Sequence, residues 1–405
     1  MPLYHSSASI LSLCATVGAG STQALGRKFS TKLFWSEVRA MDATMIQYVG
    51  ETLRYLLAAP PQIDPITGEN MDKKHNVQLA FGNGLRPDVW NRFKERFGID
   101  KIAEFFAATE APFGTWILSS NDYSVGAIGR MGWIRQAISD INLACVEVDW
   151  NTDAPRRDPK TGFCTRCKSN QPGEMLCRLD PKDIKRGFQG YFNNETATSS
   201  KVIRDVFKKG DAYYRSGDVC KWDRTQGLLY FHDRIGDTFR WKSENVSTFE
   251  VAEALGRHPR VHEANVYGVS LPHHDGRAGC VAVALDQSLD ALTSPSAKLS
   301  PSDLELMHSI ATHIDASLPR YARPLFIRIL NGVADEASTT GTNKQQKSTL
   351  RLMGVLPNNT SSGDVSGSGE KKVDVTGKMF WRSGDTFVEF GEKDWTALQG
   401  GSVKL

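Results

Sequence analysis

A short charged segment, Arg234-Ile235-Gly236-Asp237, separates two different hydrophobic patterns in the chain. Before it, short apolar runs that read as strands alternate with stretches that read as helices. After it, helices and strands follow one another in a tighter mixed order. The first pattern is typical of a wound α/β sheet and the second of a small α+β fold. We therefore expect a large α/β domain over residues 1–233 and a small α+β domain over residues 234–405.

Individual elements of the first domain follow from local patterns. Residues 78–81 and 102–106 read as strands, and residues 34–57 read as one or two helices around a short strand. A helix over residues 86–97 carries its proline in the first turn, where the missing N–H is harmless. Residues 151–190 are polar and rich in Pro, Asp and Lys. We expect a surface loop and a hairpin there.

The second domain begins with clear helix signals. Ser247 and Glu250 form a capping box for a helix that reaches about residue 257. Ser300-Pro301 opens another helix. Its apolar positions, spaced to fall on one face, are Leu304, Met307, Ala311, Ile314 and Leu318. Residues 358–369 are rich in Ser, Gly and Asn and are predicted to form a flexible loop.

Composition excludes several classes of protein. The chain has 405 residues, of which 40% are hydrophobic, as in a globular protein. Lys plus Arg number 49 and Asp plus Glu 46, a net charge of +3, so no nucleic-acid partner is expected. The basic residues of 201–209 read as a solvated face. No run of 18 apolar residues predicts a transmembrane helix.

The cysteines do not indicate a disulfide framework. There are seven, an odd number, in a chain long enough to bury a full core, which favours a reducing compartment. Cys164 and Cys167 form one C-x-x-C. No second Cys or His pair lies at zinc-finger spacing, so we interpret the motif as two incidental thiols in a loop rather than a metal or redox site.

Thr109 and Glu110 follow directly after a predicted strand. In an open α/β sheet, ligands bind outside the carboxyl ends of strands. A threonine there can hydrogen-bond a phosphate oxygen, and a glutamate can hold Mg²⁺ together with nucleotide phosphates. A helix N-cap explains the same dipeptide equally well.

Three further segments carry candidate chemistry. Asp218 ends the predicted turn 214–218, where its carboxylate could accept hydrogen bonds from two ribose hydroxyls, although an ordinary Gly-Asp turn has the same sequence. Arg234 could bind a phosphate or ribose oxygen, and Gly236 could absorb a large backbone rotation. Lys344 lies in a loop of small residues, from which a lysine can reach a phosphate or carboxylate.

Taken in this order, the four segments resemble the adenylate-forming acyl-CoA synthetases, most closely the branch of fatty acid transport proteins and very-long-chain acyl-CoA synthetases. The strings that carry the resemblance are DAYYRSGD at 211–218, YFHDRIGDTFRWK at 230–242, ENVST at 244–248 and EANVYGV at 263–269. GNGLR at 82–86 and LPRYARP at 318–324 agree with it. The resemblance runs from about residue 2 to the C-terminus.

The resemblance implies a two-step ligase reaction. ATP and a fatty acid give an acyl-adenylate and pyrophosphate, and the thiol of CoA then displaces AMP. ATP, Mg²⁺ and CoA would be the cofactor and co-substrates, with the small domain rotating between the steps. Two other readings stay open: a non-catalytic protein for fatty acid transport or interaction, and an adenylating enzyme with an acceptor other than CoA.

The resemblance also implies roles for single residues. Those around the nucleotide are Thr109 for phosphate, Glu110 for Mg²⁺, Asp218 for ribose and Arg234 beside it, with the hinge at Gly236 and Asp237. Gly82, Asn83, Gly84 and Leu85 would border adenine and the acyl group, and Tyr4 and His5 would line the acyl pocket. The adenylation lysine would be Lys344, since Lys378 matches only a Gly-Lys dipeptide.

One expected part of the family pattern does not occur among these residues. The Ser/Thr/Gly-rich phosphate loop should precede Tyr4, so we expect a truncated chain with impaired adenylation. A membrane segment of this branch should also precede that loop and would give membrane association. The resemblance implies intracellular membranes (peroxisome, endoplasmic reticulum or lipid droplet), with the plasma membrane as an alternative. Val403-Lys404-Leu405 is close to a peroxisomal address.

Overall fold

Two units make up the chain, residues 1–236 and residues 237–405. The computed structural model describes residues 3–132, 134, 136, 142–285, 292, 297–330, 347–356, 377–403 and 405. The first unit combines helices with two larger sheets and the two-stranded pair β7-β8, and the second is built on one larger mixed sheet. The expected fold class, a large α/β part followed by a smaller α+β part, is confirmed. The predicted loop at 358–369 lies outside the described residues.

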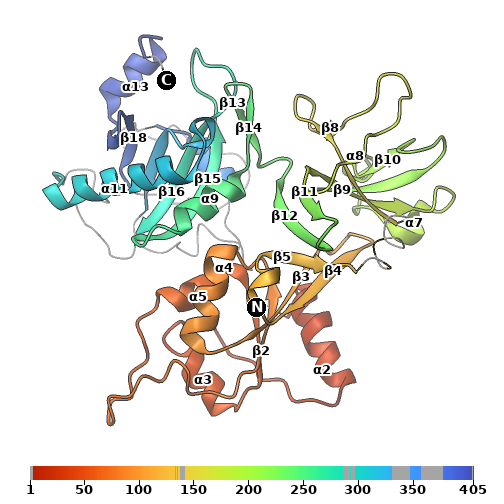
Figure 1. Ribbon diagram of the computed structural model, residues 1–405, viewed down its shortest axis with the longest axis horizontal. Coiled ribbons are helices and arrows are strands. Elements are labelled where there is room, and N and C mark those ends of the chain that lie inside the picture. The colour runs from red at the N-terminus through yellow and green to blue at the C-terminus, as the bar shows by residue number, and fades with distance from the viewer. Residues whose placement is uncertain are drawn as a thin grey trace. The chain divides into compact units, whose positions relative to one another are not determined.

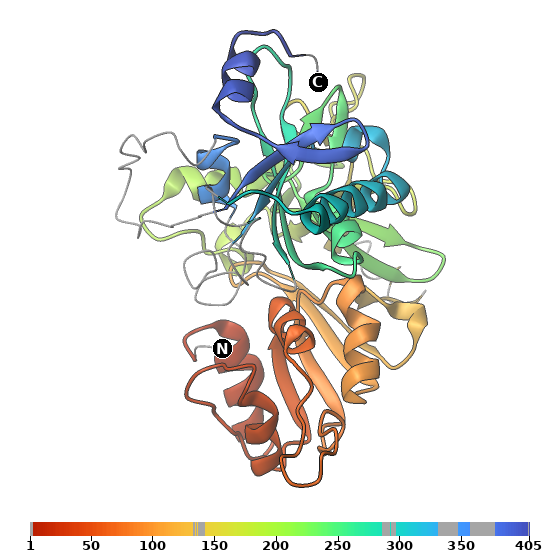
Figure 2. The same cartoon turned by 90° about the vertical axis from the view of Figure 1, so that its left-hand side faces the viewer.

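The first sheet has strand order β1-β2-β3-β4, with β1 to β3 parallel and β4 antiparallel to β3. Its strands are Met45–Val49, Leu79–Asn83, Lys101–Ala107 and Gly114–Ser119. Helices α4 (Gly50–Ala58) and α5 (Pro87–Phe97) lie on one face, and the N-terminal turns α1 (Ser6–Ala8), η1 (Ser9–Cys14) and α2 (Ala15–Gly18) lie on the other, as Figures 1 and 2 show. α3 (Phe34–Ala40) precedes β1.

Helix α5 forms where the sequence predicts it. Pro87 occupies its first turn, and Gly98 ends it in the left-handed conformation, with φ +69°. Its apolar face, Val89, Trp90, Phe93 and Phe97, is buried with Trp35 and Ile102 of the neighbouring elements. Burial of this face fixes the helix against the sheet whose strand ends carry Thr109 and the loop after β2.

The second sheet has strand order β5-β12-β11-β9-β6, all antiparallel, and β10 pairs with β11. The strands are β5 Ala127–Arg130, β6 Leu143–Val146, β9 Pro172–Leu179, β10 Val202–Arg204, β11 Ala212–Asp223 and β12 Leu228–Arg234. Shorter elements are η2 (Asp122–Ser124), β7 (Val148–Asp149), β8 (Ala154–Pro155), α7 (Ile184–Gly187) and α8 (Glu195–Ser200).

Strand β9 corrects the prediction of a surface loop and hairpin over residues 151–190. It lies between β11 and β6, and residues 173–177 within it are buried. Polar segments lie on both sides of this apolar run, so the average composition of residues 151–190 predicts a surface loop. Its one buried carboxylate, Glu174, is paired with Arg215 and so can stay inside the sheet.

The second unit is built on a sheet of order β15-β16-β17-β18-β19, in which only β16 and β17 run parallel. Its strands are Val261–Val269, Ala278–Leu285, Phe326–Ile329, Met379–Ser383 and Thr386–Glu389. The hairpin β13 (Phe239–Trp241) and β14 (Glu244–Val246) precedes it. The helices are α9 Thr248–Gly256, α11 Pro301–Ser317, η3 Arg320–Ala322, α12 Ser348–Met353 and α13 Glu392–Gln399.

Both predicted helix starts in this unit are found. Ser247 caps α9 by accepting from the amide of Glu250, and Ser300 with Asp303 forms a capping box on α11. The buried face of α11 differs in part from the predicted stripe. Leu304 is 49% exposed, whereas Leu306 and Ile310 are buried beside Met307, Ala311 and Ile314. The observed buried face is therefore rotated slightly around the helix axis relative to the predicted stripe.

Candidate active site

Asp218 lies on a bulge within strand β11, not at the tip of a turn as predicted. The register of β11 against β9 shifts between Arg215 and Val219, and Gly217 adopts φ +76°. A bulge leaves residues unpaired and re-aims their side chains. Gly217 supplies the left-handed conformation that this geometry requires. The Gly-Asp pair of the motif is thus explained by a bulge that presents the Asp218 carboxylate.

The bulge is held from inside by Glu174. This carboxylate is fully buried and accepts from Nε and Nη2 of Arg215, at 3.0 and 2.8 Å, and from the amide of Gly217 at 3.2 Å. A buried charge is tolerated when it is paired and hydrogen-bonded in this way. Arg215 therefore stabilises the fold by pairing with Glu174. Of the two charged residues in this motif, Asp218 remains the candidate for ligand binding.

Asp218 faces Arg234. The two are register partners on β11 and β12, and Nε of Arg234 lies 3.4 Å from Oδ1 of Asp218. Burial raises the pKa of Asp218, although Arg234 and Lys201 act in the opposite direction. Nζ of Lys201 also donates to the carbonyl of Ser216 at 3.0 Å. The reading of residues 201–209 as a solvated face is therefore wrong for Lys201, which belongs to the surroundings of Asp218.

Thr109 and Glu110 form a turn just beyond β3, as predicted. The amide of Ala111 donates to the carbonyl of Ala108, and strand β4 follows, so the alternative of a helix N-cap is wrong. The hydroxyl of Tyr191 donates to Oε1 of Glu110 at 2.9 Å, and Oγ1 of Thr109 lies 3.4 Å from Oγ of Ser6. The carboxylate is half-buried, while Thr109 is exposed.

Tyr214 is influenced by two of the predicted site carboxylates. Its pKa is raised by burial first and then by the charges of Glu110 and Asp218, so both carboxylates act on its phenol. Tyr191 has its pKa raised to about 12 by burial and by its bond to Glu110. Sequence reasoning missed Tyr191, because it stands in a polar segment without a motif. Thr109, Glu110, Asp218 and Arg234 thus all lie in the first unit, where the charges of Glu110 and Asp218 both act on Tyr214.

The loop after β2 brings Gly82, Asn83, Gly84 and Leu85 to the end of the first sheet. Gly84 has φ +78°, and Leu85 is buried. Oδ1 of Asn83 is buried and has no hydrogen-bond partner among the described residues. An acceptor in that state is suited to a donor group on a ligand.

The N-terminal segment reaches the same region. His5 caps α1, with its Nδ1 2.7 Å from Oγ of Ser7, and the next residue, Ser6, lies beside Thr109. Tyr4 is 84% exposed. His5 is therefore brought near the predicted phosphate residue, and Tyr4 is directed to solvent.

Of the two candidate lysines, only one is described. Lys378 is buried and donates to the carbonyl of Ala297 at 2.5 Å, with Glu389 3.2 Å away, so it serves the fold of its unit. Lys344 lies outside the described residues. At the predicted hinge, no atom would contact a Cβ on Gly236, and Asp237 pairs with Lys347 at 3.2 Å and Arg351 at 2.7 Å.

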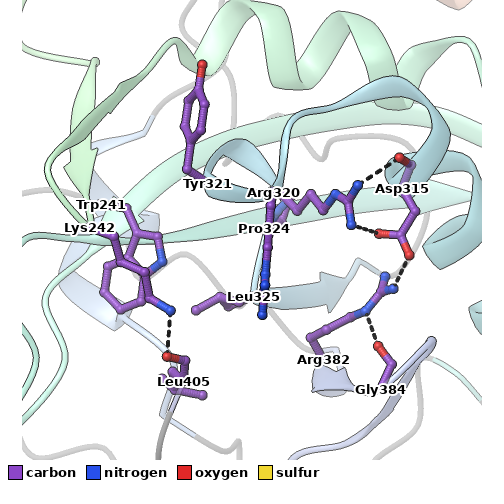
Figure 3. Close-up of a pocket in the computed structure, with 11 residues that line it drawn as sticks. Trp241, Lys242, Asp315, Arg320, Tyr321, Pro324, Leu325, Arg382, Gly384 and Leu405 are labelled. Atoms are coloured by element: carbon purple, nitrogen blue, oxygen red, sulfur yellow. Dashed lines mark hydrogen bonds and ion pairs between the residues drawn. The ribbon is translucent and has the colours of Figure 1, made fainter.

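The second unit has a basic pocket of about 690 Å³ (Figure 3). Its charged lining residues are Lys242, Arg320, Arg323, Arg382 and Asp315. The carboxylate of Asp315 forms ion pairs with Arg323, at 3.0 Å, and with Arg382, whose Nη2 donates to its Oδ2 at 2.5 Å. Arg320 makes no ion pair within the described ranges. Nζ of Lys242 donates to the main-chain oxygen of Leu405 at 2.7 Å, and the ring of Tyr321 borders the pocket. Cations therefore outnumber the carboxylate there.

The C-x-x-C thiols lie in the protein interior. Cys164 and Cys167 are buried, and Cys167 contacts Cys145 rather than Cys164. The contact with Cys167, and then burial, raise the pKa of Cys145. The part of the chain that is described contains no cluster of three or more His, Cys, Asp or Glu side chains suited to a metal ion. All seven thiols are free.

Comparisons with known proteins place the chain in a family. Residues 1–178 match the family model described as AMP-binding enzyme, and residues 250–339 match its C-terminal domain. The chain is 39% identical over its whole length to a very long-chain fatty acid transport protein of Cochliobolus heterostrophus, of which it covers 57%. It is also 39% identical to isopenicillin N epimerase component 1 of Hapsidospora chrysogena, over 100% of this chain and 61% of that protein.

A solved structure shares the fold. The anthranilate CoA ligase AuaEII, in complex with anthranoyl-AMP, superposes with a TM-score of 0.58 over 83% of this chain and 55% of that chain, at 17% identity. No helix in the described ranges is long and apolar enough to cross a bilayer. The chain spans little more than half the length of the relatives it matches. It belongs to the AMP-binding enzyme family, in the group that contains the long-chain and very-long-chain fatty acid transport proteins.

Proposed function

We propose that this chain holds the AMP moiety of an acyl-adenylate in a fatty acid–CoA ligase. The observation that carries the proposal is the pairing of Asp218 with Arg234 on adjacent strands. An ionised carboxylate accepts both ribose hydroxyls, and Arg234 favours the ionised form. The Arg234 side chain is 63% exposed, and a guanidinium carries five N–H donors that can bind phosphate or ribose oxygens.

Glu110 and Thr109 would take the phosphate side. Mg²⁺ usually binds one or two protein carboxylates and completes its shell with water and phosphates, so a single half-buried carboxylate fits it. Glu110 would supply that ligand, and the ion would neutralise phosphate charge. Thr109, exposed at the turn, would donate its hydroxyl to a phosphate oxygen.

The loop after β2 would contact the base. The buried Oδ1 of Asn83 lacks a partner within the described ranges, and adenine carries an exocyclic amino group that donates hydrogen bonds. Gly84 turns the chain sharply, which lets backbone approach a flat ring closely.

The basic pocket of the second unit supports CoA as the acyl acceptor. CoA carries several phosphate groups, which match a pocket where four cationic side chains face one carboxylate. In the reaction, a fatty acid carboxylate oxygen attacks the α-phosphorus of ATP, and pyrophosphate leaves. The CoA sulfur then attacks the acyl carbon, and AMP leaves. Lys344 would offset the charge that develops in the first step.

The experiment measures ATP–pyrophosphate exchange driven by long-chain fatty acids, with and without CoA. Exchange that depends on fatty acid supports adenylation, and release of acyl-CoA identifies the acceptor. Binding of AMP, which lacks β- and γ-phosphates, is measured in parallel. AMP binding without exchange would favour the non-catalytic reading, and exchange without acyl-CoA would favour another acceptor.

A second acyl substrate class has one specific support. A relative of equal identity bears the name isopenicillin N epimerase component 1, so relatives of this chain are not all named for fatty acids. Running the exchange assay with isopenicillin N beside palmitate compares the two candidates directly.

A further inference from the structure

Tyr48, Gly82 and Glu104 lie side by side in the sheet beneath the loop after β2. Tyr48 is the register partner of Gly82, and Gly82 is the register partner of Glu104, so the three form one row across β1, β2 and β3. Tyr48 and Glu104 are both 1% exposed. Their side chains therefore lie on the buried face of the sheet.

Gly82 makes the contact between its two neighbours possible. A Cβ on Gly82 would lie 2.5 Å from Cδ2 and 2.6 Å from Cγ of the Tyr48 ring, so any side chain would occupy the space of that ring. With glycine there, the ring crosses the middle strand and its hydroxyl donates to Oε2 of Glu104 at 2.5 Å. The glycine of this motif thus serves a protein contact, whatever ligand lies above it.

The other oxygen of Glu104 holds the loop itself. Oε1 accepts from the amide of Gly84 at 2.5 Å and from the amide of Leu85 at 3.1 Å. The loop is also confined from the far side, since a Cβ on Gly50 would lie 1.7 Å from the carbonyl oxygen of Gly84. Two consecutive amides that share one buried acceptor fix the orientation of the peptide planes on either side of Gly84.

We propose that Glu104 is a positioning residue for the nucleotide loop, Asn83 to Leu85, and sets the direction in which that loop presents Asn83 and its carbonyls. This rests on the proposed contact of the loop with adenine. The arrangement needs an acceptor at Oε1 but not a charge. If Oε2 carries a proton, it can donate to the Tyr48 oxygen while Oε1 still accepts both amides.

This distinction makes the test specific. Glu104→Met keeps the length and burial of the side chain and removes the acceptor. Glu104→Gln keeps an acceptor for the two amides and places its NH₂ toward Tyr48. Thr115→Val is the matched control, because it removes another buried hydrogen bond, from Thr115 to the carbonyl of Ile128 at 2.7 Å, on the neighbouring strand β4.

Two quantities are measured on each variant of the full chain: hydrogen–deuterium exchange of the peptide spanning residues 82–88, and the Kd for AMP by calorimetry. Loss of hydrogen bonds to a carboxyl acceptor predicts exchange about tenfold faster and AMP binding about tenfold weaker in Glu104→Met. Glu104→Gln should restore both to within about threefold of the parent, and Thr115→Val should alter neither.

The proposal is overturned if Glu104→Met leaves exchange unchanged, or if Thr115→Val weakens AMP binding as much as Glu104→Met does. It is also overturned if Glu104→Gln is as defective as Glu104→Met. If the parent chain binds no AMP, the proposed function fails. The hydrogen–deuterium exchange measurement alone then decides whether Glu104 positions the loop. If Glu104→Met does not fold, rapid exchange at Gly84 and Leu85 in the parent chain still contradicts the proposal, and slow exchange supports it.

Discussion

Arg234 and Asp218 stand opposite each other as register partners on β12 and β11, with Nε of Arg234 3.4 Å from Oδ1 of Asp218. The Asp218 side chain is 13% exposed and that of Arg234 is 63% exposed. The pair therefore has one end anchored in the sheet and one end open to solvent. An ion pair with so exposed an arginine stabilises the fold little.

Replacing Arg234 should therefore change the free energy of unfolding little, even if it weakens nucleotide binding. Arg234→Gln should lower the free energy of unfolding by less than about 1 kcal/mol, because an ion pair with so exposed a partner is screened by solvent. Urea denaturation followed by tryptophan fluorescence measures this. A loss of more than about 2 kcal/mol would mean that Arg234 is part of the structural core of the unit.

The ion pair beneath the bulge should behave in the opposite way. Arg215→Leu leaves the fully buried Glu174 without its cation, which predicts a loss of about 3–5 kcal/mol in the free energy of unfolding. Arg156→Leu, which breaks an ion pair whose arginine is 65% exposed, is the control and should cost less than about 1 kcal/mol. Equal losses in the two variants would show that Glu174 does not depend on Arg215.

Glu104 predicts a pH dependence of stability. Burial raises its pKa from the ordinary 4.5 to about 8, against the opposing effect of its three donors. Between these values the folded chain holds a proton that the unfolded chain has released, so the contribution to stability is complete below pH 4.5 and is lost as pH rises through about 8. The free energy of unfolding of the parent should fall relative to Glu104→Gln across this range. Parallel curves for the two proteins, in urea melts over the same range, would contradict the raised pKa.

The turn between β13 and β14 holds two non-glycine residues in a strained backbone conformation, which a substitution can relieve. Trp241 and Glu244 are register partners, and both residues between them have positive φ, +49° at Lys242 and +69° at Ser243. This turn type favours glycine. Ser243→Gly should raise the free energy of unfolding of the second unit by about 1 kcal/mol, while Ser243→Ala should not. A gain of the same size in both variants would place its cause outside the backbone conformation.

Local signals were sufficient for much of the fold. Pro87 and Gly98 bound α5, and Ser300 with Pro301 begins α11, because capping is decided by a few neighbouring residues. The buried strand at residues 172–179 was missed since its burial depends on β11 and β6, which pair with it from distant parts of the chain. No local pattern distinguishes such a strand from a polar loop that surrounds it.

In the candidate site too, some residues could be predicted from local sequence, whereas their surroundings could not. Asp218, Arg234, Thr109 and Glu110 could be named from motifs, because the strings that carry them are specific. The bulge under Asp218 and the approach of Tyr191 to Glu110 come from tertiary packing. The sequence predicts Lys201 to be a solvated surface charge. In the structure, its hydrogen bond to the carbonyl of Ser216 holds it near Asp218. Gly82 was assigned to the ligand, whereas its contact with the Tyr48 ring could be seen only once the strands were in register.

The most direct test of the central claim is the binding of AMP to the 405-residue chain by isothermal titration calorimetry, with Asp218→Ala and Thr115→Val in parallel. The account predicts saturable binding at one site, weakened about tenfold or more in Asp218→Ala by the loss of a charged acceptor and unchanged in Thr115→Val. Absence of saturable binding, or an Asp218→Ala protein that binds AMP as tightly as the parent, would contradict it.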